Sequence, residues 1–206
     1  RARSRGVVLA LALGGAACGT NRPDIPDYLL KDDSGTKAGY PSGPYAKDIQ
    51  SNDPVADIQF AKGWMDPKAD GYDPAKLVPI ALSDFYDPDG QKGIELVLLN
   101  TAAGWCGACK NEHAGTGSNP SLGEHAAELS PRGFRVLSAL FQDGQSNPAQ
   151  EKHLVSWAKT YETNFPFVLD PENQLGGAFN VTKLAPLNLV IEAKTRRITV
   201  VDRRGP

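Results

Sequence analysis

Residues 105–110 read Trp-Cys-Gly-Ala-Cys-Lys and follow a continuous apolar run at 94–99. That run predicts a buried central strand, and the residues after the second cysteine favour a helix. Two cysteines separated by two residues can close a reversible disulfide. A cysteine at a helix start lies beside unpaired backbone N–H groups and the positive end of the helix dipole, which favour its thiolate. We therefore expect Cys106 to be a nucleophile and Cys109 to resolve the bond that it forms.

The segments around this motif alternate between strand and helix patterns. Strands are predicted at 58–61, 77–82, 94–99, 134–141, 167–170, 187–191 and 197–201. Helices are predicted at 109–114, 122–129, 147–162 and 171–179. Ser121 with Glu124 forms a capping-box pattern, and Asn147 before Pro148 reads as another helix start. The order predicts an α/β sandwich, a central mixed β-sheet flanked by helices, with the cysteine pair at the carboxyl end of a central strand.

The first 17 residues have the pattern of an export signal. Three arginines precede the apolar run 7–13, and small residues at 14–17 lead into Cys18. The run is far shorter than the roughly 20 residues needed to cross a bilayer, so residues 1–17 are predicted to be a signal peptide. The small residues before Cys18 resemble the lipobox of bacterial lipoproteins, although Gly15 stands where that pattern usually has leucine. The resemblance implies that Cys18 is a lipid anchor, and the alternatives are cleavage after Ala17 without lipid or a spare thiol.

Residues 18–54 are rich in proline, glycine, aspartate, serine and asparagine and have no sustained apolar period. They are predicted to be a Pro/Gly-rich tether, an N-terminal extension before a domain at 55–206. Several tyrosines and leucines make the segment more apolar than a spacer requires. It is therefore open whether part of it lies along the domain surface.

The overall composition excludes some partners and leaves few cysteines. Among 206 residues, 22 are basic and 24 acidic, so no basic field is available to hold nucleic acid. The three cysteines are all used, one as anchor and two as a redox pair. Nothing remains for a structural disulfide, and a lone C-x-x-C in an exported chain is better explained as catalytic or metal-binding.

Residues 55–203 as a whole resemble the thioredoxin superfamily. The likeness depends on Trp105 and Lys110 flanking the cysteines and on Pro186 before a later strand. The closer resemblance is to the TlpA/ResA type, membrane-tethered bacterial thiol:disulfide oxidoreductases that act on exported cysteine proteins. The lead-in at 82–85 and the long segment 134–166 are similar to that type. The resemblance implies a thioredoxin-like fold.

The same resemblance implies roles for individual residues. Ala185 and Pro186, with a cis bond between them, would hold an extended substrate, and Trp105 would shield the edge of the site. Asn100 occupies the position of a buried proton-relay acid in cytoplasmic thioredoxins. Glu112 matches the active-site acid of the TlpA/ResA type and would transfer the proton of the second cysteine. The alternatives are a solvated helix-face charge for Glu112 and a packing role for Trp105.

Two departures from the family pattern affect redox potential and partner choice. The residues between the cysteines are Gly107-Ala108 instead of Gly-Pro, and Ala114 replaces the proline that usually kinks the first helix. The glycine-rich segment 115–120 is expected to supply that bend.

The expected cofactor is none beyond the redox-active disulfide Cys106–Cys109, and no resident metal is expected. The implied partners are cysteine-containing exported proteins and an upstream thiol-disulfide electron donor. The chain is expected to be a monomer in the bacterial periplasm or cell envelope, held on a membrane through lipidated Cys18. Either direction of electron flow fits the sequence.

Three other functions compete with this hypothesis. A copper- or zinc-binding carrier would use the cysteine pair with His113 and His125, but their spacing fits no standard zinc-finger order. A peroxidase is the second, although Ala103 stands where peroxiredoxins have threonine. A redox-inert binding module is the third, and the intact cysteine pair opposes it.

The remaining aromatic and histidine side chains are given structural roles. His113, His125 and His153 are expected to be surface or capping residues. Trp157 and Tyr161 are expected to pack in the core or at its rim.

Overall fold

The computed structural model describes residues 39–182 and 184–202. The predicted signal peptide 1–17 and the predicted anchor Cys18 lie outside the described residues. Within the described ranges, no helix is long and apolar enough to cross a membrane.

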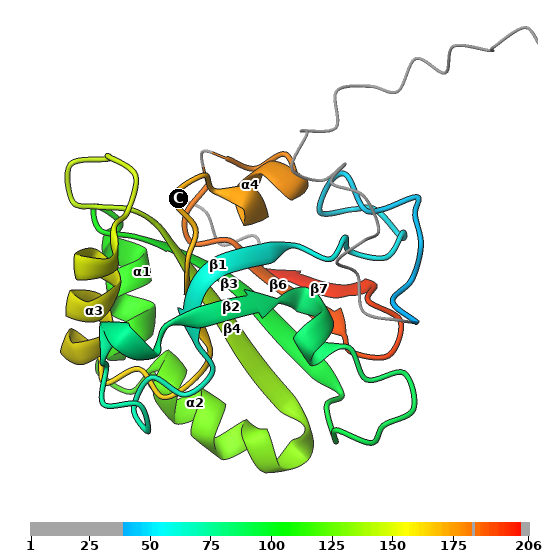
Figure 1. Ribbon diagram of the computed structural model, residues 1–206, viewed down its shortest axis with the longest axis horizontal. Coiled ribbons are helices and arrows are strands. Elements are labelled where there is room, and N and C mark those ends of the chain that lie inside the picture. Colours follow the sequence, from blue (N-terminus) through cyan, green and yellow to red (C-terminus); the bar gives the residue numbers. More distant parts are fainter. Residues whose placement is uncertain (1–38, 183, 203–206) are drawn as a thin grey trace, which may run out of the picture.

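A mixed sheet of seven strands forms the centre of the molecule (Figure 1). Its strands are β1 (Gln59–Trp64), β2 (Val78–Ala81), β3 (Leu96–Ala103), β4 (Phe134–Gln142), β5 (Phe167–Leu169), β6 (Asn188–Glu192) and β7 (Ile198–Asp202). They lie in the order β2-β1-β5-β4-β3-β6-β7. The inner strands β3, β4 and β5 run parallel, and the outer pairs are antiparallel. The predicted mixed α/β sandwich is therefore confirmed.

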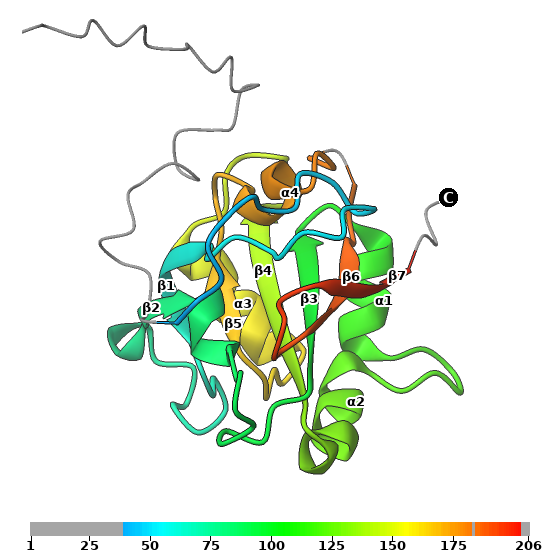
Figure 2. The same ribbon diagram turned by 90° about the vertical axis from the view of Figure 1, so that its right-hand side faces the viewer.

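Helices cover both faces of the sheet (Figure 2). They are α1 (Gly107–Ala114), α2 (Leu122–Leu129), α3 (Glu151–Thr160) and α4 (Gln174–Ala178). Short 3-10 helices cover Pro74–Lys76, Leu82–Phe85 and Ser130–Arg132. Helices α1 and α3 lie side by side over one core cluster, and α4 packs on the other (Figures 1 and 2).

The alternation of side chains along β3 separates the two cores. Val97 and Leu99 point to the cluster that contains α4 residues, whereas Ala102 belongs to the cluster under α1 and α3. Because successive side chains of a strand face opposite sides, Asn100 lies on the α1 side. The strand starts two residues later than predicted, at Leu96, and ends four residues later, at Ala103.

Helix α3 begins later than the sequence indicates, which corrects the predicted start at Asn147. Asn147 instead closes a turn, with its backbone N–H donating to Asp143 Oδ1 at 2.9 Å. Pro148 pairs with Gln142 in an isolated bridge at the end of β4, so this segment stays extended before the helix starts. The N-cap is Gln150.

The other predicted helix boundaries agree more closely with the structure. The capping box at Ser121 and Glu124 is present, and α2 begins at the next residue as predicted. Helix α1 ends at Ala114, where Gly115 adopts a φ of 73° and the chain turns away. The glycine-rich segment therefore separates α1 from α2. Helix α4 is confined to Gln174–Ala178, shorter than the predicted 171–179.

Part of the predicted tether packs on the domain. The Tyr40 hydroxyl donates to the carbonyl oxygen of Val55 at 2.8 Å and accepts from Arg196 Nε at 3.0 Å. Tyr40 and Ala46 are both buried. Residues 39–54 therefore lie along the domain, and the question that the sequence left open is answered for this stretch.

Candidate redox site

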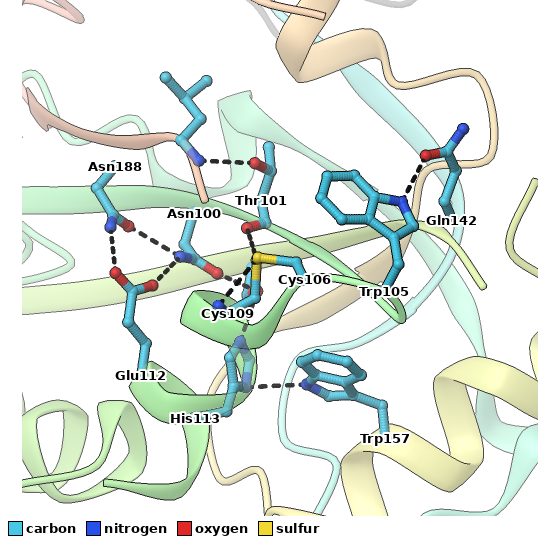
Figure 3. Close-up of a disulfide and its surroundings, with 12 residues drawn as sticks. Asn100, Thr101, Trp105, Cys106, Cys109, Glu112, His113, Gln142, Trp157 and Asn188 are labelled. Atoms are coloured by element: carbon cyan, nitrogen blue, oxygen red, sulfur yellow. Dashed lines mark hydrogen bonds between the residues drawn. A yellow bond between two sulfur atoms is a disulfide. The ribbon is translucent and has the colours of Figure 1, made fainter. Parts of the chain in front are cut away.

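The cysteine pair lies at the start of α1, directly beyond the carboxyl end of β3 (Figure 3). Cys106 is the N-cap of this helix and is joined to Cys109 by a disulfide with an Sγ–Sγ distance of 2.11 Å. The backbone N–H of Cys109 points at Cys106 Sγ, with an N–S distance of 3.0 Å. Cys109 is fully buried and Cys106 is 3% exposed, so the second cysteine is the more enclosed.

Close backbone approach fixes the segment before the motif. A Cβ atom on Gly104 would lie 2.6 Å from backbone atoms of Asp143 and Gly144. Any side chain there would force apart the tips of β3 and the loop after β4. Glycine at 104 therefore allows the turn that presents Trp105 and Cys106.

Trp105 lies at the edge of the site with 41% of its surface exposed. Its indole Nε1 donates to Gln142 Oε1 at 2.8 Å, and its ring meets Phe141 edge-to-face at 6.3 Å (Figure 3). These contacts hold an apolar ring in an exposed position beside the disulfide. Gln142 was not identified from the sequence, because nothing in the sequence shows that the end of β4 reaches Trp105.

The loop at Ala185–Pro186 is tied to the central strand next to the cysteines. The Ala185–Pro186 bond is cis, which confirms the expectation from the resemblance. The backbone N–H of Leu187 donates to Thr101 Oγ1 at 2.9 Å, and Cys109 Sγ lies 3.8 Å from the carbonyl oxygen of Thr101. Ala185 packs against the core cluster that contains both cysteines. The residues predicted to bind substrate are therefore gathered around one disulfide.

Glu112 is half-buried on α1 and binds two amide side chains. Its Oε1 accepts from Asn188 Nδ2 at 2.8 Å, and its Oε2 accepts from Asn100 Nδ2 at 3.2 Å. Glu112 is therefore held against the sheet, and the alternative of a solvated helix-face charge is wrong. Its role in proton transfer stays a prediction.

A row of polar side chains crosses the sheet beneath α1. Asn188 lies directly opposite Asn100 in the antiparallel pairing of β6 with β3, and Asn100 is level with Ser138 in the parallel pairing of β3 with β4. Ser138 Oγ donates to Asn100 Oδ1 at 2.6 Å, and Asn100 Nδ2 donates to Asn188 Oδ1 at 2.8 Å. Sequence reasoning found Asn100 and missed the other two. The available sequence feature was a polar residue with apolar neighbours on both sides, at 138 and again at 188.

His113 is buried, which corrects its predicted surface or capping role. It is 2% exposed and lies four residues after Cys109, on the face of α1 that meets the sheet. Trp157 Nε1 donates to its Nδ1 at 3.1 Å, and its Nε2 lies 3.4 Å from Ser138 Oγ. Burial lowers the pKa of His113 to about 3. The imidazole is therefore neutral at neutral pH.

The other two histidines, and the aromatic residues in and directly after α3, occupy the places predicted for them. His125 is exposed on α2, and His153 Nδ1 accepts the backbone N–H of Gln150 at 3.1 Å, which caps α3. Trp157 is buried and Tyr161 is half-buried at the rim of the same cluster.

The described residues contain no group of three or more histidine, cysteine, aspartate or glutamate side chains placed to hold a metal ion. Both ring nitrogens of His113 are engaged within the protein, by Trp157 and Ser138. The metal-carrier alternative requires a free ring nitrogen on His113, and both nitrogens bond to other side chains instead.

Comparisons with known proteins found a matching family model and similar solved structures. A model of the AhpC/TSA family matches residues 72–206. No curated protein matches the sequence.

Three solved structures illustrate the similarity of fold, each with a TM-score of 0.51. A DsbF homologue from Corynebacterium diphtheriae is 16% identical, and the match covers 77% of this chain and 85% of that one. The thioredoxin domain of a thiol-disulfide oxidoreductase from Bacteroides vulgatus is 13% identical, with coverage of 75% and 89%. Enterococcus faecalis AhpC is 16% identical, with coverage of 75% and 82%. These similarities confirm the predicted thioredoxin-like fold.

Proposed function

This chain belongs to the AhpC/TSA family, and from that membership and the geometry of its cysteine pair we propose that it is an exported thiol-disulfide oxidoreductase. It exchanges disulfides with cysteine-containing proteins through Cys106 and Cys109. The observation that carries the proposal is a C-x-x-C disulfide whose first sulfur caps α1 and faces the N–H of the second cysteine. A donor in that position, with the helix dipole, favours the thiolate that attacks.

The proposed reaction has two exchange steps. In the reduced protein, the Cys106 thiolate attacks one sulfur of a partner disulfide. A Cys106–partner bond forms, and the other partner sulfur leaves as a thiolate and takes up a proton. Cys109 then loses its proton and attacks Cys106 Sγ, which closes the Cys106–Cys109 bond and releases the second partner thiol. The partner gains two electrons and the cysteine pair loses two; an upstream thiol-disulfide donor returns them. The reverse sequence oxidises a dithiol partner.

The buried second cysteine needs a group to accept its proton. Cys109 is fully buried, and Glu112 lies three residues further along α1 with its carboxylate fixed by Asn100 and Asn188. We assign proton transfer to Glu112 on this geometry. In Glu112→Gln, alkylation of Cys109 is expected to require higher pH, and an unchanged pH profile would refute the assignment.

Trp105, Ala185 and Pro186 are proposed to bind the partner chain. The exposed indole of Trp105 and the loop at 185–186 flank the disulfide, and this loop is held to β3 through Thr101. An extended peptide lying between them would bring its own disulfide to Cys106.

Export and membrane attachment through Cys18 belong to the same proposal. They depend on the pattern of residues 1–18 described above. Mass spectrometry of the mature N-terminus tests them: a diacylglyceryl-modified Cys18 is expected, and an unmodified N-terminus would remove the anchor.

Peroxide reduction is the second candidate, because Enterococcus faecalis AhpC shares the fold and the family name. Ala103 is buried three residues before Cys106 and offers a methyl group where peroxiredoxins have a hydroxyl. We therefore expect the purified protein to consume peroxide more slowly than it reduces a protein disulfide. The opposite ranking would favour the peroxidase.

The experiment for the main proposal traps the first step. Full-length protein carrying Cys18→Ser and Cys109→Ser is reduced and mixed with a small aromatic disulfide. A stable mixed disulfide on Cys106 is expected by mass spectrometry, because the resolving thiol is absent. The matched variant with Cys106→Ser is expected to react far more slowly, since Cys109 is buried. Equal labelling of the two variants would contradict the assigned roles.

A further inference from the structure

The polar row beneath α1 continues into a buried histidine that the proposed mechanism does not use. Asn188, Asn100 and Ser138 occupy level positions on β6, β3 and β4. Helix α1 lies over this row and contributes two successive residues, with Glu112 above the asparagine end and His113 above the serine end (Figure 3). Glu112 and the buried histidine therefore belong to one series of hydrogen bonds.

Trp157 determines which atoms donate and which accept along this series of hydrogen bonds. An indole N–H can only donate, so the Nδ1 atom of His113 that it contacts at 3.1 Å must be the acceptor. In a neutral imidazole the proton is then on Nε2, which faces Ser138 Oγ at 3.4 Å. Ser138 receives this bond and gives its single hydrogen to Asn100 Oδ1 at 2.6 Å.

The same order of donors and acceptors continues to the carboxylate of Glu112. With its Oδ1 engaged by Ser138, Asn100 turns its amide hydrogens to Glu112 Oε2 and to Asn188 Oδ1. Asn188 in turn donates to Glu112 Oε1. If Asn100 were reversed, its oxygen would face two other oxygens. Each donor in the series therefore points toward Glu112.

We propose that His113 is a positioning residue for the proposed thiol-disulfide exchange. Through Ser138 and Asn100 it fixes the donors that hold Glu112, one helical turn after Cys109 on α1. The inference rests on the proposed function, because a fixed carboxylate serves the removal of the proton from Cys109. Asn100 and Ser138 are fully buried, so water does not replace a lost partner there.

The surroundings of His113 are aromatic. Its ring lies 5.2 Å from Trp157, 5.8 Å from Tyr161 and 5.8 Å from Phe165. Phe167, level with Ser138 on the next strand, lies 6.0 Å away. Tyr161 is the titratable ring among these neighbours, and burial raises its pKa above the ordinary value. Tyr161 therefore stays neutral at neutral pH.

The test measures the pH profile for alkylation of Cys109 in reduced, full-length protein carrying Cys18→Ser and Cys106→Ser. His113→Phe keeps a ring and removes the donor, whereas Ser138→Ala removes one oxygen. Each is expected to slow alkylation about threefold to tenfold at pH 7, the effect of one buried hydrogen bond. Above the thiol's titration range the rates are expected to converge with those of the parent.

Matched variants separate positioning from packing. His113→Gln restores an N–H donor toward Ser138 and is expected to stay within about twofold of the parent. Phe165→Leu disturbs the same aromatic cage without touching a hydrogen bond, so its profile is expected to match the parent. The double variant His113→Phe with Ser138→Ala is expected to be alkylated no more slowly than either single variant, since both substitutions interrupt the same series of hydrogen bonds.

Profiles for His113→Phe and Ser138→Ala that coincide with the parent would overturn the proposal. If the phenylalanine variant does not fold, Ser138→Ala alone decides. Alkylation requires no partner protein, so the outcome is separable from the proposed function. A parent protein that fails to exchange disulfides would refute that function, whereas unchanged alkylation profiles would refute the role of His113.

Discussion

The two faces of the sheet bury polar groups in different ways. Beside α4, the Asp170 carboxylate accepts the backbone N–H groups of Gln174 at 2.8 Å and Leu175 at 3.2 Å. That arrangement is local and stabilises the start of one short helix. Beneath α1, side chains from three strands and two helices bond to one another, and the series ends at Glu112 near the disulfide. A buried polar series that crosses the sheet connects distant elements to the site, which a helix cap does not do.

The two faces also respond to pH in opposite directions. Burial lowers the pKa of His113 to about 3 and raises the pKa of Asp170 to about 6. In both cases burial disfavours the charged form. His113 is a base and Asp170 is an acid. Acidification therefore lowers the stability of the folded protein through His113 and raises it through Asp170.

The largest expected effect is the acid sensitivity caused by His113. Below pH 6.5 the unfolded chain protonates this histidine while the folded protein does not until about pH 3, so stability falls as the pH drops through that window. The expected loss is on the order of 4 kcal/mol. Urea unfolding of wild type and His113→Gln from pH 7 to 3.5 measures it, and the glutamine variant should lack this part of the slope. Parallel stability curves for the two proteins would mean that His113 is protonated in the folded state.

Asp170→Asn is expected to have a smaller effect of opposite sign. The folded protein binds a proton at Asp170 near pH 6, whereas the unfolded chain binds it near 3.8, so this group adds stability as the pH falls from 6 toward 4. The gain is about 3 kcal/mol at most. The same urea series should show that Asp170→Asn loses this gain. A variant that follows wild type between pH 6 and 4 would show that the carboxyl group is not desolvated.

Within the row, the centre should matter more than the edge. Ser138→Ala leaves the buried Asn100 Oδ1 without its donor and is expected to lower the free energy of unfolding by about 2 kcal/mol. Asn188→Ala removes a half-buried amide that water can partly replace, with a loss of about 1 kcal/mol. Unfolding at pH 7 compares them directly. A larger loss for Asn188→Ala would place the energetic centre of the row at its exposed end.

Local sequence features predicted which residues begin the helices and strands around the site. The contacts between those elements depend on the tertiary structure. The helix-start position of Cys106, the cap at Ser121 and the proline before a strand are visible in short windows. The burial of His113 and its contact with Trp157 depend on how α1 and α3 are placed over the sheet. The pairing of Asn100 with Asn188 and Ser138 depends on strand register, which no short window contains.

Some local features led to a wrong prediction. Asn147 before Pro148 has the residue types of a helix start, but its backbone and side chain bond to Asp143, and Pro148 forms a bridge with the last residue of β4. Competition between a turn and a helix cap for the same asparagine is settled by the preceding residues, which is why α3 begins at Glu151.

The proposed function requires Cys106 and Cys109 to form a reversible redox pair, and oxidation by glutathione tests that requirement. Reduced full-length protein carrying Cys18→Ser is treated with oxidised glutathione and analysed by intact mass and by mapping of the peptide that contains 105–110. The expected product is a protein lighter by two hydrogens with a closed Cys106–Cys109 bond, and two molecules of reduced glutathione are released for each chain. A protein that keeps glutathione on one cysteine, or keeps both thiols free, would contradict it.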